Sequence, residues 1–74
     1  MREAEAGLHM ARSNLRKSRE ELDLSESEFR RAKELVDRGV ASLTRLENAE
    51  QTLGARRAAL EAAISNLEMA KGAL

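Results

Sequence analysis

Val36-Asp37-Arg38-Gly39-Val40-Ala41-Ser42 is the stretch that decides the fold, because it interrupts a long helical pattern. Gly39 takes a left-handed backbone conformation at little cost and is expected to end a helix, with Arg38 near the negative helix end. Ser42 can cap a following helix. The alternative cap is the first residue of Thr44-Arg45-Leu46-Glu47, which has the pattern of a capping box. The stretch therefore predicts a helix end, a tight turn and a second helix.

Heptads precede this turn. The large apolar residues stand seven positions apart, as do the small residues between them. The large set is Leu8, Leu15, Leu22, Phe29 and Val36, and the small set is Ala4, Ala11, Ser18, Ser25 and Ala32. This alternation is typical of a coiled-coil seam in which one core position is large and the other is small.

The heptads continue after the turn. The large set is Leu46, Leu53, Leu60, Leu67 and Leu74, and the alternate set is Ala49, Arg56, Ala63 and Ala70. Folding the chain about residue 41 sets large residues opposite large ones, from Val36 with Leu46 out to Leu8 with Leu74, and small residues between them. We therefore predict an all-α fold, an antiparallel two-helix coiled-coil hairpin. Helix one covers about residues 2–37, the tip about 38–42 and helix two about 43–74. Each arm should be a rod of roughly 50 Å.

The composition excludes several classes of protein. The chain has 74 residues, no Cys and one His, so it has neither a disulfide nor a thiolate metal site. Thirteen basic residues balance 13 acidic ones, and Phe29 is the one aromatic residue, which disfavours a nucleic-acid partner. Two helices alone bury little surface, and the seam runs on to Leu74. We therefore expect the chain to be an excised fragment of a larger protein.

No catalytic pattern is present in the sequence. We find no nucleophile–base pair, phosphate loop or metal cluster, so we expect no enzyme activity, no cofactor and no metal site. His9 is interpreted as a surface helix residue rather than a metal ligand. Gly54, within helix two, is either simply tolerated or a point where another hairpin packs closely.

Charged residues on the helices suggest specific ion pairs. Arg56 falls at a core position opposite Ser25. We expect its side chain to extend out of the seam and pair with Glu26, and the alternative is a contact with a neighbouring copy. Glu26 with Arg30, and Glu34 with Arg38, have favourable spacing for ion pairs along helix one.

The tip carries a three-residue pattern, Arg-x3-Leu-x6-Ser, formed by Arg31, Leu35 and Ser42. Leu35 also belongs to an apolar cluster at the turn with Val40 and Leu43, which suggests a docking surface. The segment Arg31-Ala-Lys-Glu-Leu-Val-Asp-Arg-Gly-Val-Ala-Ser42 resembles the hairpin tip of the periplasmic adaptor family, the HlyD-type membrane fusion proteins. The flanking heptads also look like that family.

The resemblance implies a function in efflux or secretion. Such adaptors link an inner-membrane transporter to a TolC-type outer-membrane channel in the periplasm of Gram-negative bacteria, usually with six copies side by side. The parent protein would be anchored to the inner membrane, and the transporter would be bound through domains outside these residues. By match to the motif, Arg31, Leu35 and Ser42 would contact the channel. Further candidate tip contacts are Arg38, Gly39, Val40 and Leu43.

A structural coiled-coil spacer from an unrelated protein is the alternative function. It explains the heptads and the turn but leaves the tip motif to chance. Substitutions confined to the tip separate the two hypotheses, because a spacer should tolerate them.

Overall fold

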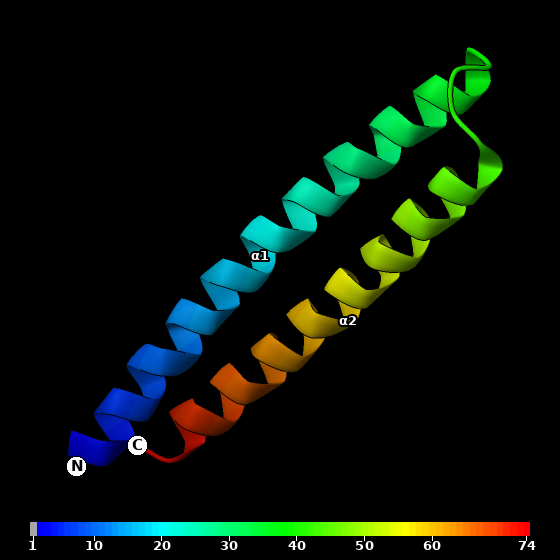
Figure 1. The fold of residues 1–74 in the computed structure, drawn as a ribbon. Helices are drawn as coiled ribbons and strands as arrows, with labels where there is room; N and C mark the ends of the chain where they lie inside the picture. Colours follow the sequence, from blue (N-terminus) through cyan, green and yellow to red (C-terminus); the bar gives the residue numbers. More distant parts are fainter. Residues whose placement is uncertain (1) are drawn as a thin grey trace.

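The computed structural model describes residues 2–74 and contains two long helices, α1 (Arg2–Asp37) and α2 (Leu43–Gly72). They run antiparallel and side by side, with both chain ends at one end of the rod and the connecting turn at the other (Figure 1). The Cα atoms extend over 57 × 13 × 11 Å. The predicted all-α hairpin is confirmed.

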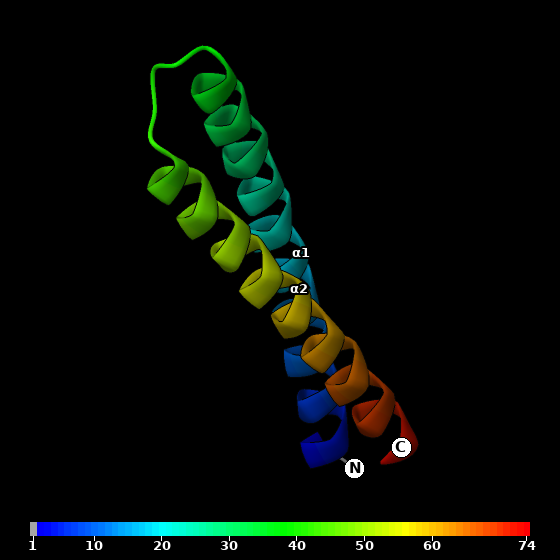
Figure 2. The same cartoon turned by 90° about the vertical axis from the view of Figure 1, so that its right-hand side faces the viewer.

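The seam between the helices follows the heptads. The most buried residues are mainly the small ones, together with one leucine: Ala11, Ser25, Ala32, Leu53 and Ala63. The remaining large heptad residues are half-buried, apart from Leu74, because solvent reaches both sides of a two-helix seam. Figure 2 shows the two helices crossing at a shallow angle along this seam. Close approach of the backbones at the small residues lets the large side chains of each helix pack over its partner.

The turn is closed by backbone hydrogen bonds around Gly39, whose φ is 75°. The Gly39 N–H donates to the Val36 carbonyl at 2.9 Å, and the Val40 N–H donates to the Leu35 carbonyl at 2.8 Å. This pair of bonds is the Schellman arrangement, which satisfies carbonyls that the helix end would leave free. The prediction that Gly39 ends helix one is confirmed.

Ser42 is the N-cap of α2. Its extended backbone precedes the helix, and its hydroxyl oxygen accepts a hydrogen bond from the Arg45 N–H at 3.3 Å. The alternative cap, Thr44 with Glu47, is wrong because Thr44 already lies inside the helix that Ser42 begins.

At its far end α2 stops at Gly72, two residues before the predicted limit. The Ala73 N–H is shared between the Met69 carbonyl at 3.2 Å and the Ala70 carbonyl at 3.3 Å, a tightened last turn. Leu74 lies beyond the helix and is 66% exposed, so its expected burial opposite Leu8 is wrong. Within residues 2–74 the carbonyls from Lys71 onward have no N–H four positions ahead, so the last residues do not continue the helix.

Arg56 extends out of the seam as predicted but reaches a different carboxylate. Its Nη1 lies 3.4 Å from Oε2 of Glu21, so the predicted pairing with Glu26 is wrong. Glu26 follows Glu21 by five residues and therefore lies on the opposite flank of the seam, out of line with Arg56. Ser25, opposite Arg56, is 4% exposed and donates its hydroxyl hydrogen to the Glu21 carbonyl at 2.9 Å.

Of the two ion pairs expected along α1, one forms. Arg38 and Glu34 approach to 2.8 Å, whereas Arg30 donates to the Ser27 hydroxyl at 3.4 Å instead of pairing with Glu26. No helix within residues 2–74 combines the length and apolar character needed to cross a membrane.

Candidate functional site at the hairpin tip

The three motif residues lie around the turn. Arg31 and Leu35 occupy the last two turns of α1, and Ser42 directly precedes α2. Arg31 and Ser42 are exposed, and Leu35 is half-buried. The fold therefore gathers residues that are up to 11 positions apart in the sequence at one end of the rod.

Leu35 holds the turn with its backbone while part of its side chain stays accessible. Its carbonyl accepts hydrogen bonds from the N–H groups of both Val40 and Ala41, at 2.8 and 3.2 Å. Val40 and Leu43, the other apolar tip residues, are 71% and 65% exposed. The turn fixes the backbone of Leu35 and Val40, so the accessible apolar surface of these two residues requires little backbone ordering to bind a partner.

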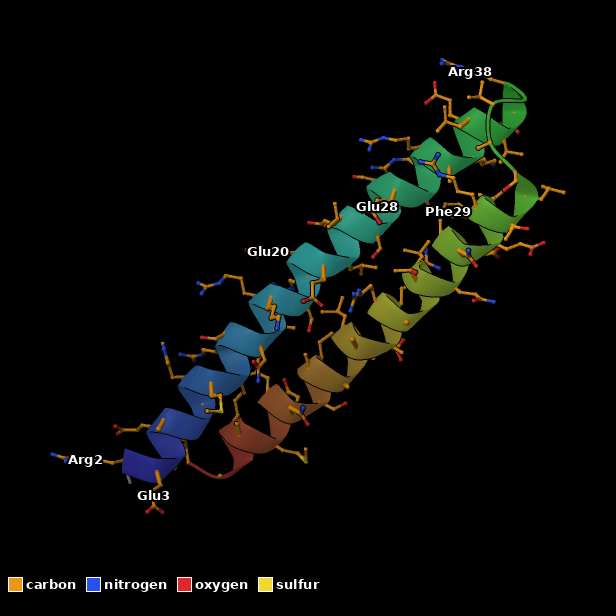
Figure 3. All side chains as sticks on the ribbon, viewed as in Figure 1. Arg2, Glu3, Glu20, Glu28, Phe29 and Arg38 are labelled. Carbon is orange, nitrogen blue, oxygen red and sulfur yellow. The ribbon has the colours of Figure 1, made fainter. Side chains whose placement is uncertain are left out.

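Arg38, Gly39 and Ser42, by contrast, each already have a role within the hairpin. Arg38 is held in the exposed ion pair with Glu34, and Figure 3 shows its side chain at the extreme tip, directed away from the rod. Gly39 is exposed, but the turn depends on its positive φ. The Ser42 hydroxyl oxygen already accepts the capping hydrogen bond, which leaves its hydrogen available to a partner.

Arg31 belongs to a surface groove between the two helices. The groove is lined by Glu28, Arg31 and Ala32 of α1 and by Arg45 and Ala49 of α2, and its volume is about 230 Å³. Ligand pockets usually measure roughly 300–1,000 Å³. The groove is thus the size of one or two side chains rather than of a cofactor.

Arg45 is the tip residue that the sequence reasoning missed. Neither Arg45, Arg31 nor Glu28 takes part in an ion pair within residues 2–74. The heptads contained the information needed to find Arg45. When the pairing of core positions about residue 41 is extended to the positions beside the core, Arg45 lies opposite Leu35, on the side of the seam that carries Glu28.

The described part of the chain, residues 2–74, contains no group of three or more His, Cys, Asp or Glu side chains that could hold a metal ion. Comparisons with protein-family models, with curated proteins and with solved structures found no match.

Proposed function

We propose that the chain is the hairpin domain of a periplasmic adaptor that docks by its tip onto a TolC-type outer-membrane channel. The adaptor would link this channel to an inner-membrane transporter for efflux or secretion. The observation that carries the proposal is the arrangement of Arg31, Leu35 and Ser42 around a rigid turn, beside the exposed Val40 and Leu43.

Each motif residue has a distinct role in this proposal. Leu35 buries its accessible apolar surface in a groove between helices of the channel. Arg31, which forms no ion pair within residues 2–74, donates to carbonyls or carboxylates there. Ser42 is small, so it permits close approach, and it both caps α2 and donates a hydrogen bond to the channel.

The remaining parts of the proposal follow from the family resemblance. Adaptor copies would stand side by side, usually six together, in the periplasm of a Gram-negative bacterium. Contact with the transporter would be made by other domains of the adaptor.

Cysteine cross-linking to a purified TolC-type channel tests the proposal, because the chain has no cysteine of its own. A Val40→Cys variant places a thiol at the tip without altering the motif. Met10→Cys is the matched control, since Met10 is 66% exposed but lies near the opposite end of the rod. The channel carries one cysteine at its periplasmic tip.

The expected result is a cross-link from Val40→Cys alone, reduced when Leu35→Ala or Arg31→Gln is added. Equal cross-linking from both positions, or none from either, would contradict tip docking. A spacer from an unrelated protein would then be the better explanation of the hairpin.

A further inference from the structure

The groove near the tip is lined by two arginines from different helices. Arg31 comes from α1 and Arg45 from the first turn of α2, and both line the same hollow. Neither guanidinium is paired with a carboxylate of residues 2–74. Two unneutralised like charges on one small groove favour the binding of an anion between them.

The groove exists because the layer beneath it is made of alanines. Ala32 is 2% exposed and Ala49 is half-buried, so both belong to the packed seam and neither can fill the hollow above it. A larger residue at either heptad position would occupy that space. The hollow is therefore a product of the small layers that let the two helices approach.

Arg45 is held in place by the cap of its own helix. The Ser42 hydroxyl oxygen accepts from the Arg45 N–H, and Ser42 follows directly on the turn that Gly39 closes. The backbone at Arg45 is thus fixed relative to α1. Only the side chain of Arg45 therefore has to be ordered when it binds a partner.

Glu28 is the third charged group of the groove. It supplies one negative charge against two positive ones, and it forms no ion pair with either arginine. The net charge of the groove is therefore positive, and the Glu28 carboxylate opposes an incoming anion.

We propose that this groove binds one carboxylate side chain, Asp or Glu, of the partner protein, and that Arg45 acts with Arg31 as a specificity-determining residue. The fork of each guanidinium matches the two oxygens of a carboxylate. A volume of about 230 Å³ suits one such side chain. The inference rests on the proposed function only for the identity of the partner, the channel.

NMR of the arginine Nε–Hε groups tests the groove without the channel. The probe is a capped Gly-Ser-Glu-Ser-Gly peptide titrated into the 74-residue chain, and the matched peptide has Gln in place of Glu. We expect the signals of Arg31 and Arg45 to shift together with the Glu peptide and not with the Gln peptide. Arg57 is the internal reference, because it is exposed, unpaired within residues 2–74 and absent from the groove.

Three variants sharpen the test, each checked for helical content by circular dichroism. Arg45→Gln should weaken binding of the Glu peptide several-fold and reduce the shift of the Arg31 signal. Arg57→Gln should leave both unchanged. Glu28→Gln should strengthen binding, because it removes the opposing carboxylate, and this opposite sign cannot result from a loss of folding.

The inference is overturned if the Glu peptide shifts neither arginine, if Arg45→Gln has no more effect than Arg57→Gln, or if inorganic phosphate binds more tightly than the peptide. Its failure is separable from that of the proposed function. Peptide binding without any cross-link to the channel would support the groove and reject that channel as partner. A cross-link without peptide binding would reject the groove alone.

Discussion

At the middle of the rod Arg56 reaches Glu21 at 3.4 Å, whereas near the tip Arg31 and Arg45 share a groove with Glu28 and pair with nothing in residues 2–74. Both regions are built over small residues of the seam, which leave room for long side chains. In the middle of the rod the nearby carboxylate is in line with the arginine, and the charge is satisfied internally. Near the tip the Glu28 carboxylate does not pair with Arg31 or Arg45, so the two positive charges remain available to a partner.

The apolar residues differ between the same two regions. Leu53, in the seam, is 6% exposed, whereas Leu43, at the start of α2, is 65% exposed. Burial of Leu53 stabilises the hairpin, and the exposed side chain of Leu43 adds little to folding. The buried apolar side chains of the rod therefore hold the helices together, and the exposed apolar side chains of the tip are free to serve another purpose.

The largest effect should come from removing a buried rod residue. Leu53→Ala should lower the free energy of unfolding by about 2–5 kcal/mol, because it removes apolar contacts and leaves a cavity. Leu43→Ala is the control and should change it by less than about 0.5 kcal/mol. Thermal unfolding followed by circular dichroism measures both. Equal losses of unfolding free energy in the two variants would mean that Leu43 contributes to the core as much as Leu53, and the difference between tip and rod would not hold.

The next effect concerns two glycines whose substitution by alanine should change the stability of the hairpin in opposite directions. Gly39→Ala should destabilise the hairpin by roughly 1–2 kcal/mol, because φ at this position is 75° and the cost of that backbone falls on any residue with a Cβ. Gly54→Ala should stabilise it by about 1 kcal/mol, since Gly54 lies inside α2 and an added Cβ meets nothing within 4 Å.

Urea unfolding of the two variants gives these signs directly. Destabilisation by Gly54→Ala would show that Gly54 is needed for close packing, for instance against another hairpin. Stabilisation by Gly39→Ala would contradict the account of the turn.

A smaller effect separates the two roles of Ser42. Ser42→Ala should cost about 1 kcal/mol by removing the cap of α2, and Ser42→Asn should restore most of it because asparagine caps equally well. If Ser42 also contacts the channel, Ser42→Asn should fold normally but bind the channel more weakly. Thermal unfolding and channel affinity, measured on both variants, distinguish the roles. Normal affinity of Ser42→Asn would reduce Ser42 to a cap.

The smallest effect is expected at Glu21, whose carboxylate lies 3.4 Å from Arg56 and 3.9 Å from Lys17. Glu21→Gln should lower stability by about 0.2–1 kcal/mol, because both partners are partly exposed and screened by solvent. The loss should disappear in 1 M salt, because the Debye screening length there is roughly 3 Å and the charges no longer attract appreciably. Glu20→Gln, on the exposed surface beside it, is the control. A loss that persists in high salt would mean that Glu21 acts through packing instead.

Most of this fold could be predicted from the sequence, since heptads on both sides of Gly39 determine which residues face each other. The cap at Ser42 and the Glu34–Arg38 pair also followed from local spacing. The partner of Arg56 did not, because it depends on which flank of the seam each carboxylate occupies.

The candidate site was predicted less completely. The sequence motif identified Arg31, Leu35 and Ser42 within a continuous segment, but Arg45 joins Arg31 only through the pairing of the two helices. A groove is a property of both helices together. Its lining comes from positions beside the seam on both α1 and α2, and the motif contributes only Arg31 of α1.

Affinity for a TolC-type channel, measured with immobilised channel at several salt concentrations, tests the difference between rod and tip most directly. Arg31→Gln should weaken binding by about tenfold or more, the value of one charge-assisted hydrogen bond, and should flatten the salt dependence. Arg56→Gln, the matched loss of an arginine on the rod, should bind as the unchanged chain does. Equal affinity of both variants would contradict the account, because the tip would then be no more specialised for binding than the rod.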